Sequence, residues 1–375
     1  MSSRGATVDR VVMICVLALL GLGSVTVFSS STDLSQQIYS SPAAMTMKHL
    51  TRVAIGLFLL VVFARMDYRV LRRLALPMVF TAGTMLALTL IPGFPLARTV
   101  KGATRWLDLG FLVIQPAEVA KISLVVFVAA VLSQGEGRIR NWKRGVVPVL
   151  TVLGIFAFFL VNQPNFGNVL TLGLLTATML WLGGARLTHL AAAGGSTVPV
   201  VMILALHKPH VIARFQTFLN PEADPMGSGF QLRQSLVAIG SGGMFGLGPG
   251  AGRQSEFFLP DCHTDFVFAI LGEEFGLLGT LAVVALFVVL VWRGLKIARG
   301  APDLFGRYLA VGVTAMIGIV AILNMSVVLG LAPTTGLPLP FVSYGGSAMM
   351  VNLAGVGLLL SIAARSGMTR RRVVG

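Results

Sequence analysis

Long apolar runs dominate this chain of 375 residues and restrict its architecture more than any other feature. Several runs reach the roughly 18 to 20 apolar residues that a helix needs to cross a bilayer. Only 11% of the residues are charged, against about 25% in an ordinary soluble domain, and 55% are hydrophobic. We therefore predict an all-α polytopic membrane protein.

The runs predict about ten transmembrane helices within a single integral membrane domain, residues 1–375. The first run follows Arg4 and Arg10, as in a secretory signal peptide, but its length and the later spans favour a retained helix. The sixth and seventh runs are short and closely spaced, so one of them could be re-entrant or tilted. The predicted spans are about 10–30, 50–66, 73–92, 113–134, 146–162, 167–183, 187–206, 265–293, 306–331 and 344–364.

Most of the 29 Lys and Arg residues fall on the two tails and on short connections that share their side. Cytoplasmic loops of membrane proteins carry this excess, so we expect both termini in the cytoplasm. A large extracytoplasmic loop, 207–264, then lies between the seventh and eighth helices. The net charge of +15 reflects topology and contacts with anionic lipids, and we predict no nucleic-acid partner.

The large loop contains two further patterns. Apolar positions at helical spacing predict a short interfacial helix within 229–239. The glycine-rich stretch 240–252 is either a flexible loop or backbone that can approach a substrate closely. No strand precedes it, which excludes a dinucleotide fingerprint. Cys15 and Cys262 fall in a span and a loop, so neither a disulfide framework nor a metal site is predicted.

Asp265 is the strongest candidate for a catalytic residue, because it stands where the polar loop meets the eighth apolar run. A general base with cationic neighbours such as Arg253, His263 and Lys121 is one interpretation. An N-cap of the eighth helix is the other. Glu273 and Glu274 lie about 12 Å farther along that helix, at 1.5 Å per residue, and are expected to support the cavity.

Other polar residues near the outer face have both structural and functional interpretations. Glu118 and Lys121 share a face of the fourth span, either as a structural ion pair or as lining of an outward cavity where Lys121 meets a phosphate. Arg105 lies just outside the membrane, and residues 163–165 predict a tight outer turn. Ser343 and Tyr344 belong to a loop, 337–347, whose hydroxyls and helix-start N–H groups suit an anion.

Four separate motifs resemble the signatures of the SEDS family, the bacterial FtsW, RodA and SpoVE proteins. The motifs occur in the family's order and the resemblance covers nearly the whole chain. They are Gln-Pro-Ala-Glu-Val-Ala-Lys at 115–121, Gly-Ser-Gly-Phe-Gln at 227–231, His-Thr-Asp-Phe-Val-Phe at 263–268, and Gly-Leu-Pro-Leu-Pro-Phe-Val-Ser-Tyr-Gly-Gly-Ser at 336–347.

This resemblance implies a ten-helix glycosyltransferase of the bacterial cytoplasmic (inner) membrane. It would polymerise lipid II, an undecaprenyl diphosphate disaccharide-pentapeptide, into peptidoglycan glycan strands on the extracytoplasmic side. A class B penicillin-binding protein transpeptidase and other division or elongation complex proteins are the implied partners. The family's essential Asp corresponds to Asp265, and its polar cavity pair to Glu118 and Lys121. Asn165 stands where the family commonly has Asp.

The stretch 271–276 favours the division (FtsW) type, with the elongation (RodA) type as the alternative. Asp265 would accept the proton of an incoming GlcNAc 4-hydroxyl, which displaces the diphosphate with inversion. Lys121, Arg233, Arg253 or a divalent cation (Mg²⁺ or Mn²⁺) would neutralise the leaving group. A flippase or transporter of lipid-linked precursors and a recruiting scaffold are the rival classes. The candidate substrate-binding residues are Glu118, Lys121, Arg105, Arg233, Gln234, Arg253, His263, Thr264, Ser343 and Tyr344.

Overall fold

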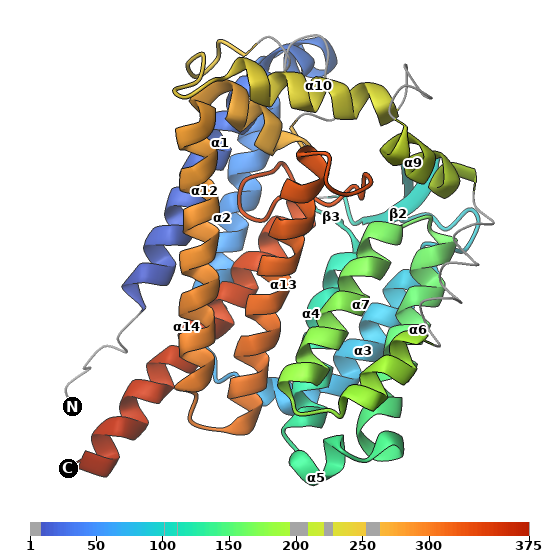
Figure 1. The fold of residues 1–375 in the computed structure, drawn as a ribbon, viewed down its shortest axis with the longest axis vertical. Coiled ribbons are helices and arrows are strands. Elements are labelled where there is room, and N and C mark those ends of the chain that lie inside the picture. Colours follow the sequence, from blue (N-terminus) through green and yellow to red (C-terminus); the bar gives the residue numbers. More distant parts are fainter. Residues whose placement is uncertain are drawn as a thin grey trace.

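The computed structural model describes residues 9–100, 102–110, 112–195, 209–220, 228–252 and 263–374. Its long helices form two groups that lie side by side (Figure 1). The first contains α1 (Arg10–Tyr39), α2 (Ala44–Arg65), α12 (Val267–Arg299), α13 (Leu304–Val328) and α14 (Gly346–Val374). The second contains α3 (Val70–Leu88), α4 (Pro116–Leu132), α6 (Val147–Asn162) and α7 (Phe166–Leu182), with a short helix α5 (Glu136–Ile139) and a π-helical turn, η1 (Trp142–Val146), between α4 and α6. Helix α13 joins the groups by packing on α4 and α7.

Seven helices in the described part of the chain are long and apolar enough to cross a membrane. Helices α4 and α7, at 17 residues each, occupy two further predicted spans. The predicted seventh span, 187–206, is helical over 187–195, and its remainder lies outside the described residues. Large side chains such as Phe58, Phe80, Phe158 and Trp181 are exposed on the helices, as expected where lipid is the solvent. The prediction of a polytopic helical membrane protein is confirmed.

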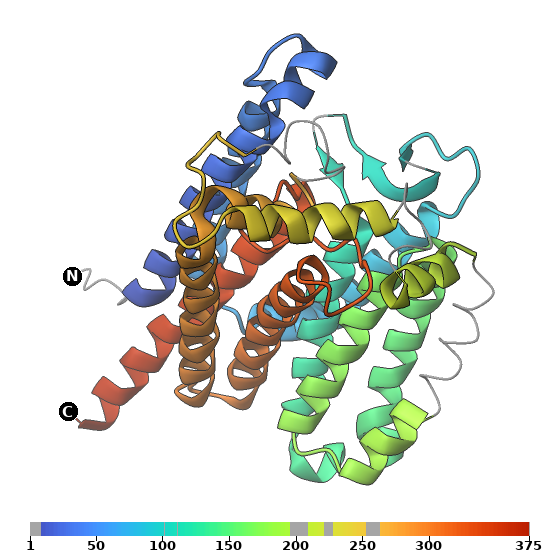
Figure 2. The same ribbon diagram turned by 45° about the horizontal axis from the view of Figure 1, so that its top comes forward.

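The two ends of the bundle differ in character. Helix α1 begins and α14 ends at the same end, whereas α9 (Pro209–Leu219) and α10 (Ser228–Ser241) lie at the other (Figures 1 and 2). Helix α10 runs across the ends of α12 and α13, and the Ser235 hydroxyl donates to the Val328 carbonyl at 2.7 Å. The expected short helix within 229–239 is therefore present. Helix α2 ends at Arg65, α3 begins directly after Arg69, and α12 ends at Arg299, all at the first end. We therefore call the first end the basic end and the second the polar-loop end.

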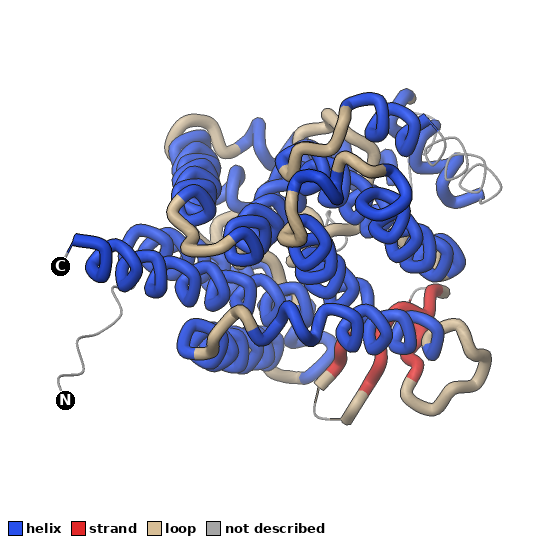
Figure 3. Tube along the Cα trace, turned by 90° about the horizontal axis from the view of Figure 1, so that it is seen from below, coloured by secondary structure: helices blue, strands red, loops and turns tan. Residues whose placement is uncertain are grey.

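A small antiparallel sheet, which the all-α prediction missed, also lies at the polar-loop end. Its order is β1 (Ala97–Val100), β2 (Ala103–Asp108), β3 (Val113–Ile114), and it forms one edge of the molecule in Figure 3. Gly102, with φ of +74°, makes the turn between the first two strands. These strands are too short for an alternating pattern to stand out beside spans of twenty apolar residues.

The glycine-rich stretch packs against a break in α12. Gly276 has φ of +65° and ψ of −163°, which interrupts the helix there. The freed backbone groups bond to the loop: Leu247 N donates to Glu273 O at 2.9 Å, and Gly248 N to Glu274 O at 3.0 Å. The Glu274 side chain accepts from the Ser29 hydroxyl and from Gly250 N. The close approach that the glycines permit is therefore to α12 itself, and Glu274 ties this loop to α1.

We predict that Gly246→Ala destabilises the protein more than Gly250→Ala. Both glycines have positive φ, +81° and +77°, so both substitutions carry a similar backbone strain. A Cβ at Gly246 would collide with the Glu274 carbonyl, whereas a Cβ at Gly250 meets nothing within 4 Å. The apparent Tm of Gly246→Ala in detergent should fall at least about 2 °C below that of Gly250→Ala. Equal Tm values would contradict the close backbone contact between Gly246 and α12.

Candidate active site at the polar-loop end

Asp265 lies in a turn that immediately precedes α12. The N-cap of α12 is Phe266, which makes no side-chain cap, so the N-cap interpretation of Asp265 is wrong. The Asp265 side chain is partly exposed. Its backbone carbonyl accepts from the Asn324 amide at 2.8 Å, and the same amide nitrogen donates to Leu337 O at 2.7 Å. Asn324 therefore holds the turn that carries Asp265 against the loop that precedes α14.

This second loop faces the Asp265 carboxylate with backbone. A Cβ built on Gly336, whose φ is +70°, would lie 3.7 Å from Asp265 Oδ2. Tyr344 N donates to the His263 carbonyl at 2.9 Å, and the His263 and Tyr344 rings meet edge to face at 5.7 Å. His263, Thr264, Asp265, Gly336 and Tyr344 are thus brought together, as the motifs predicted.

Two serine hydroxyls of this loop have structural partners. Ser343 Oγ is buried and accepts from Leu339 N at 2.8 Å. Ser347 Oγ accepts from Gln115 N at 2.8 Å and donates to Val113 O at 3.1 Å, which fastens the start of α14 to β3 and α4. Ser343 is therefore a residue that shapes the loop, and the prediction that its hydroxyl binds substrate is not supported by its contacts.

Arg105 reaches the site from β2. Its Nε donates to Gln163 O at 3.0 Å and its Nη2 to Pro164 O at 2.5 Å. The tight turn that supplies these acceptors is itself held, because Gln163 Nε2 donates to Leu86 O at 3.0 Å and to Thr89 Oγ1 at 2.6 Å. The predicted outer turn thus positions an arginine, and it does so through backbone carbonyls.

Arg214, on α9, is a site residue that the sequence analysis missed. Its Nη1 donates to Thr334 O at 3.1 Å. Burial lowers the pKa of both Arg105 and Arg214, and the Arg214 charge lowers that of Arg105 further, whereas the Asp265 carboxylate raises both. Helix α9 was not predicted, although apolar residues from Val211 to Leu219 recur at helical spacing. Its only arginine, Arg214, was therefore not among the predicted site residues.

The other predicted residues lie elsewhere or in other roles. Lys121 Nζ pairs with Glu118 Oε1 at 2.7 Å, and both side chains are only 2 to 3% exposed, which favours the structural ion pair over a phosphate contact. Arg233 is exposed on α10 and Gln234 is half-buried beside it. Arg253 lies outside the described residues.

The site therefore combines one partly exposed carboxylate with two half-buried guanidiniums. Arg105 uses two of its five N–H donors on the turn and Arg214 one on the Thr334 carbonyl, which leaves donors available for another acceptor. Guanidinium groups bind phosphate oxygens through paired hydrogen bonds. The arrangement can accept a proton at Asp265 and bind a phosphorylated group next to it.

A family model described as cell cycle protein, that of FtsW, RodA and SpoVE, matches residues 9–367. The chain belongs to this family. It is 40% identical to the probable peptidoglycan glycosyltransferase FtsW of Trichlorobacter lovleyi over 361 residues, which cover 96% of this chain and 94% of the relative. It is 38% identical to the stage V sporulation protein E of Bacillus subtilis, over 98% of this chain and 100% of the relative.

Two solved structures share the fold. A chain from a study of how a peptidoglycan synthase complex coordinates polymerization and crosslinking has a TM-score of 0.78 and 30% identity, covering 96% of this chain and 98% of that one. The rod shape determining protein RodA of Thermus thermophilus has a TM-score of 0.69 and 27% identity, covering 95% and 97%. The resemblance seen in the motifs thus extends over the whole architecture.

We predict that Lys121→Met destabilises the protein strongly, by about 3 to 5 kcal/mol, because it leaves the Glu118 carboxylate buried without its partner. Adding Glu118→Gln should recover much of this loss, because no charge then remains buried. Denaturant unfolding of the two variants in a fixed detergent measures the coupling. Full additivity of the two substitutions would contradict the pairing.

Proposed function

We propose that this chain polymerises lipid II into peptidoglycan glycan strands and that it is of the division type. Its family membership and the names of its FtsW relatives support the reaction and the type. The observation that carries the site assignment is the convergence of Asp265, Arg105 and Arg214 at one end of the helical bundle. This combination supplies the proton acceptor and the anion-binding groups that the reaction requires.

The reaction joins an incoming sugar hydroxyl to the anomeric carbon of a lipid-linked glycan. Asp265 accepts the proton from the GlcNAc 4-hydroxyl as its oxygen attacks that carbon. The bond to the diphosphate breaks, undecaprenyl diphosphate leaves as an anion, and the configuration inverts. One base suffices, because a diphosphate leaves without protonation by a second carboxylic acid.

Arg105 and Arg214 stabilise the charge that develops on the departing diphosphate. Both are pre-positioned by backbone carbonyls, so little reorganisation is needed as charge builds up. We assign this role to the two arginines and not to Lys121, because Lys121 forms a buried ion pair with Glu118. The exposed Arg233 on α10 is a weaker candidate.

The described part of the site offers few side-chain ligands for a divalent cation. Among the described residues no group of three or more His, Cys, Asp and Glu side chains could hold a metal ion. We therefore derive no step through a metal.

The location and partners follow from the same proposal. The basic end faces the cytoplasm, so the polar-loop end and Asp265 face the extracytoplasmic side of the bacterial cytoplasmic membrane. A class B penicillin-binding protein would crosslink the strands, and the structural relative from a synthase complex with polymerization and crosslinking supports such a partner. Helices α9 and α10 lie at the same end of the molecule as the site and offer a surface for such a partner (Figure 1).

We predict that Asp265→Asn lowers the polymerisation rate by about 10² to 10⁴-fold, because the amide cannot accept the proton. The measurement is gel separation of glycan products made from labelled lipid II by the purified protein with its transpeptidase. Asp108→Asn is the matched control, since Asp108 is a partly exposed carboxylate at the same end and pairs with Arg98. An Asp265→Asn variant that folds and keeps full activity would refute the assignment of Asp265 as the general base. Absence of polymer with the unaltered protein would favour a flippase or a scaffold.

Arg214→Gln should also slow polymerisation, by about 10 to 10³-fold, because one donor to the diphosphate is lost. Arg214→Lys should recover only part of the rate, since an ammonium cannot bind through a planar fork. Arg233→Gln serves as the comparison, and we expect a smaller effect from this exposed residue. Initial rates with graded lipid II separate binding from turnover. Equal losses for Arg214→Gln and Arg233→Gln would show that α9 has no special role.

A further inference from the structure

A basic cavity lies at the opposite end of the molecule from Asp265. It has a volume of about 470 Å³ and lies where α3 and α13 begin and α4 ends. Its lining includes Arg69, Arg72, Arg73, Ser133 and Asp303. A water molecule occupies roughly 30 Å³ in the liquid, so the cavity can hold a much larger polar group.

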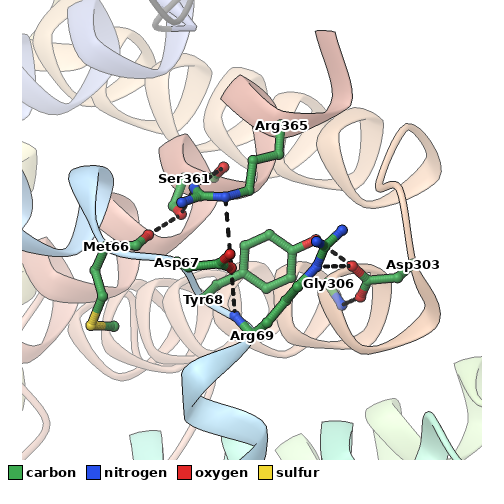
Figure 4. A network of polar contacts seen from close by, with 8 residues as sticks. All are labelled: Met66, Asp67, Tyr68, Arg69, Asp303, Gly306, Ser361 and Arg365. Atoms are coloured by element: carbon green, nitrogen blue, oxygen red, sulfur yellow. Dashed lines mark hydrogen bonds and ion pairs between the residues drawn. The ribbon is translucent and has the colours of Figure 1, made fainter. Parts of the chain in front are cut away.

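The single carboxylate in the lining is already used by the protein (Figure 4). Asp303 Oδ2 accepts from Tyr68 Oη at 2.6 Å and from Arg69 Nε at 3.0 Å, and its Oδ1 accepts from Gly306 N at 2.8 Å. Burial raises the pKa of Asp303, but these hydrogen bonds outweigh it and hold the pKa below its usual range. Asp303 therefore compensates Arg69, and it forms no ion pair with Arg72 or Arg73.

Arg72 and Arg73 are exposed and bring two further positive charges to the cavity. Neither forms an ion pair with a carboxylate in the part of the chain that the structure describes. Both belong to the first turn of α3, which contains no acidic residue. Because a helix N-terminus carries partial positive charge, cations there are repelled unless an anion lies nearby. Asp67 already lies at this helix end, where its Oδ1 accepts from Arg69 N at 3.0 Å, and it also pairs with Arg365. An anion in the cavity would compensate the two remaining guanidiniums.

The cavity also borders the surface that faces lipid. Leu304 lines it and is 46% exposed, and Leu74, one position after Arg73, is 43% exposed. Helices α3 and α13 are both candidate membrane spans, so their first turns lie at the level of lipid head groups. A ligand with a phosphate head and an apolar tail would satisfy both the arginines and the exposed leucines.

We propose that this cavity binds the phosphate of an anionic glycerophospholipid from the adjacent leaflet. Basic pockets between transmembrane helices are suited to such head groups, because nearby arginines attract the anionic phosphate. The site is separate from Asp265 and does not depend on the polymerase proposal.

The experiment is native mass spectrometry of the full-length protein with phosphatidylglycerol, with phosphatidylcholine, or with inorganic phosphate in place of lipid. Arg72→Gln with Arg73→Gln should weaken retention of phosphatidylglycerol about tenfold or more. The matched control is Arg186→Gln with Arg299→Gln, two exposed arginines near the same end but outside the cavity, which should change retention little. Equal weakening in the two double variants would overturn the proposal.

A further variant guards against misfolding. Ser133→Glu leaves all the arginines in place and puts a carboxylate into the cavity wall, so it too should lower phosphatidylglycerol retention. Unchanged retention in Ser133→Glu would contradict the site. Inorganic phosphate that displaces phosphatidylglycerol at millimolar concentration, or equal retention of phosphatidylcholine, would assign the cavity to a free phosphate or to no specific anion and so refute the lipid.

Discussion

The amide of Asn324 joins two irregular segments on which the candidate site depends. In a membrane protein, non-helical backbone at the end of a span needs partners for its polar groups, since lipid supplies none. Asn324 is 1% exposed and donates to both Asp265 O and Leu337 O. Without this amide, the turn before α12 and the loop before α14 would lose the partner of one carbonyl each. One buried side chain on α13 therefore connects the turn that carries Asp265 to the loop that begins at Gly336.

The same principle explains how irregular backbone is satisfied elsewhere at this end. Ser347 connects the start of α14 to β3 and α4, Gln163 holds the outer turn, and Glu274 binds the glycine-rich loop. These polar residues were conspicuous in the sequence because they occur beside apolar runs. The contacts show that such residues in this protein serve mostly to anchor loops, and that few are left for substrate.

Prediction from sequence succeeded where a strong local pattern exists. The spans, the helix within 229–239 and the grouping of His263, Asp265 and Tyr344 follow from apolar runs, helical spacing and short motifs. It was less successful where the outcome depends on tertiary contacts. Arg214 could not be selected, because its role arises from the distant Asp265 and Thr334.

The structural role of the Ser343 hydroxyl was missed for the same physical reason. A serine in a helix-start loop can bind a ligand or cap its own backbone, and spacing does not distinguish the two. Its partner, Leu339 N, lies only four residues away, but between the two residues Phe341 has a φ of +65°, which no pattern in the sequence predicted. The sheet at 97–114 was missed because short strands carry a weaker signal than the spans around them.

The acidic residues near the start of α12 show how burial separates chemical roles. Glu273 and Glu274 are each 1% exposed, and Glu274 is committed to Ser29 and Gly250. Asp265 is the one described carboxylate of this stretch that is both partly exposed and within the influence of two guanidiniums. The break at Gly276 separates the first turns of α12 from the rest of the helix, and the glycine-rich loop and α10 hold those turns in place. The position of Asp265 therefore also depends on these contacts, because they hold the helical turns that directly follow it.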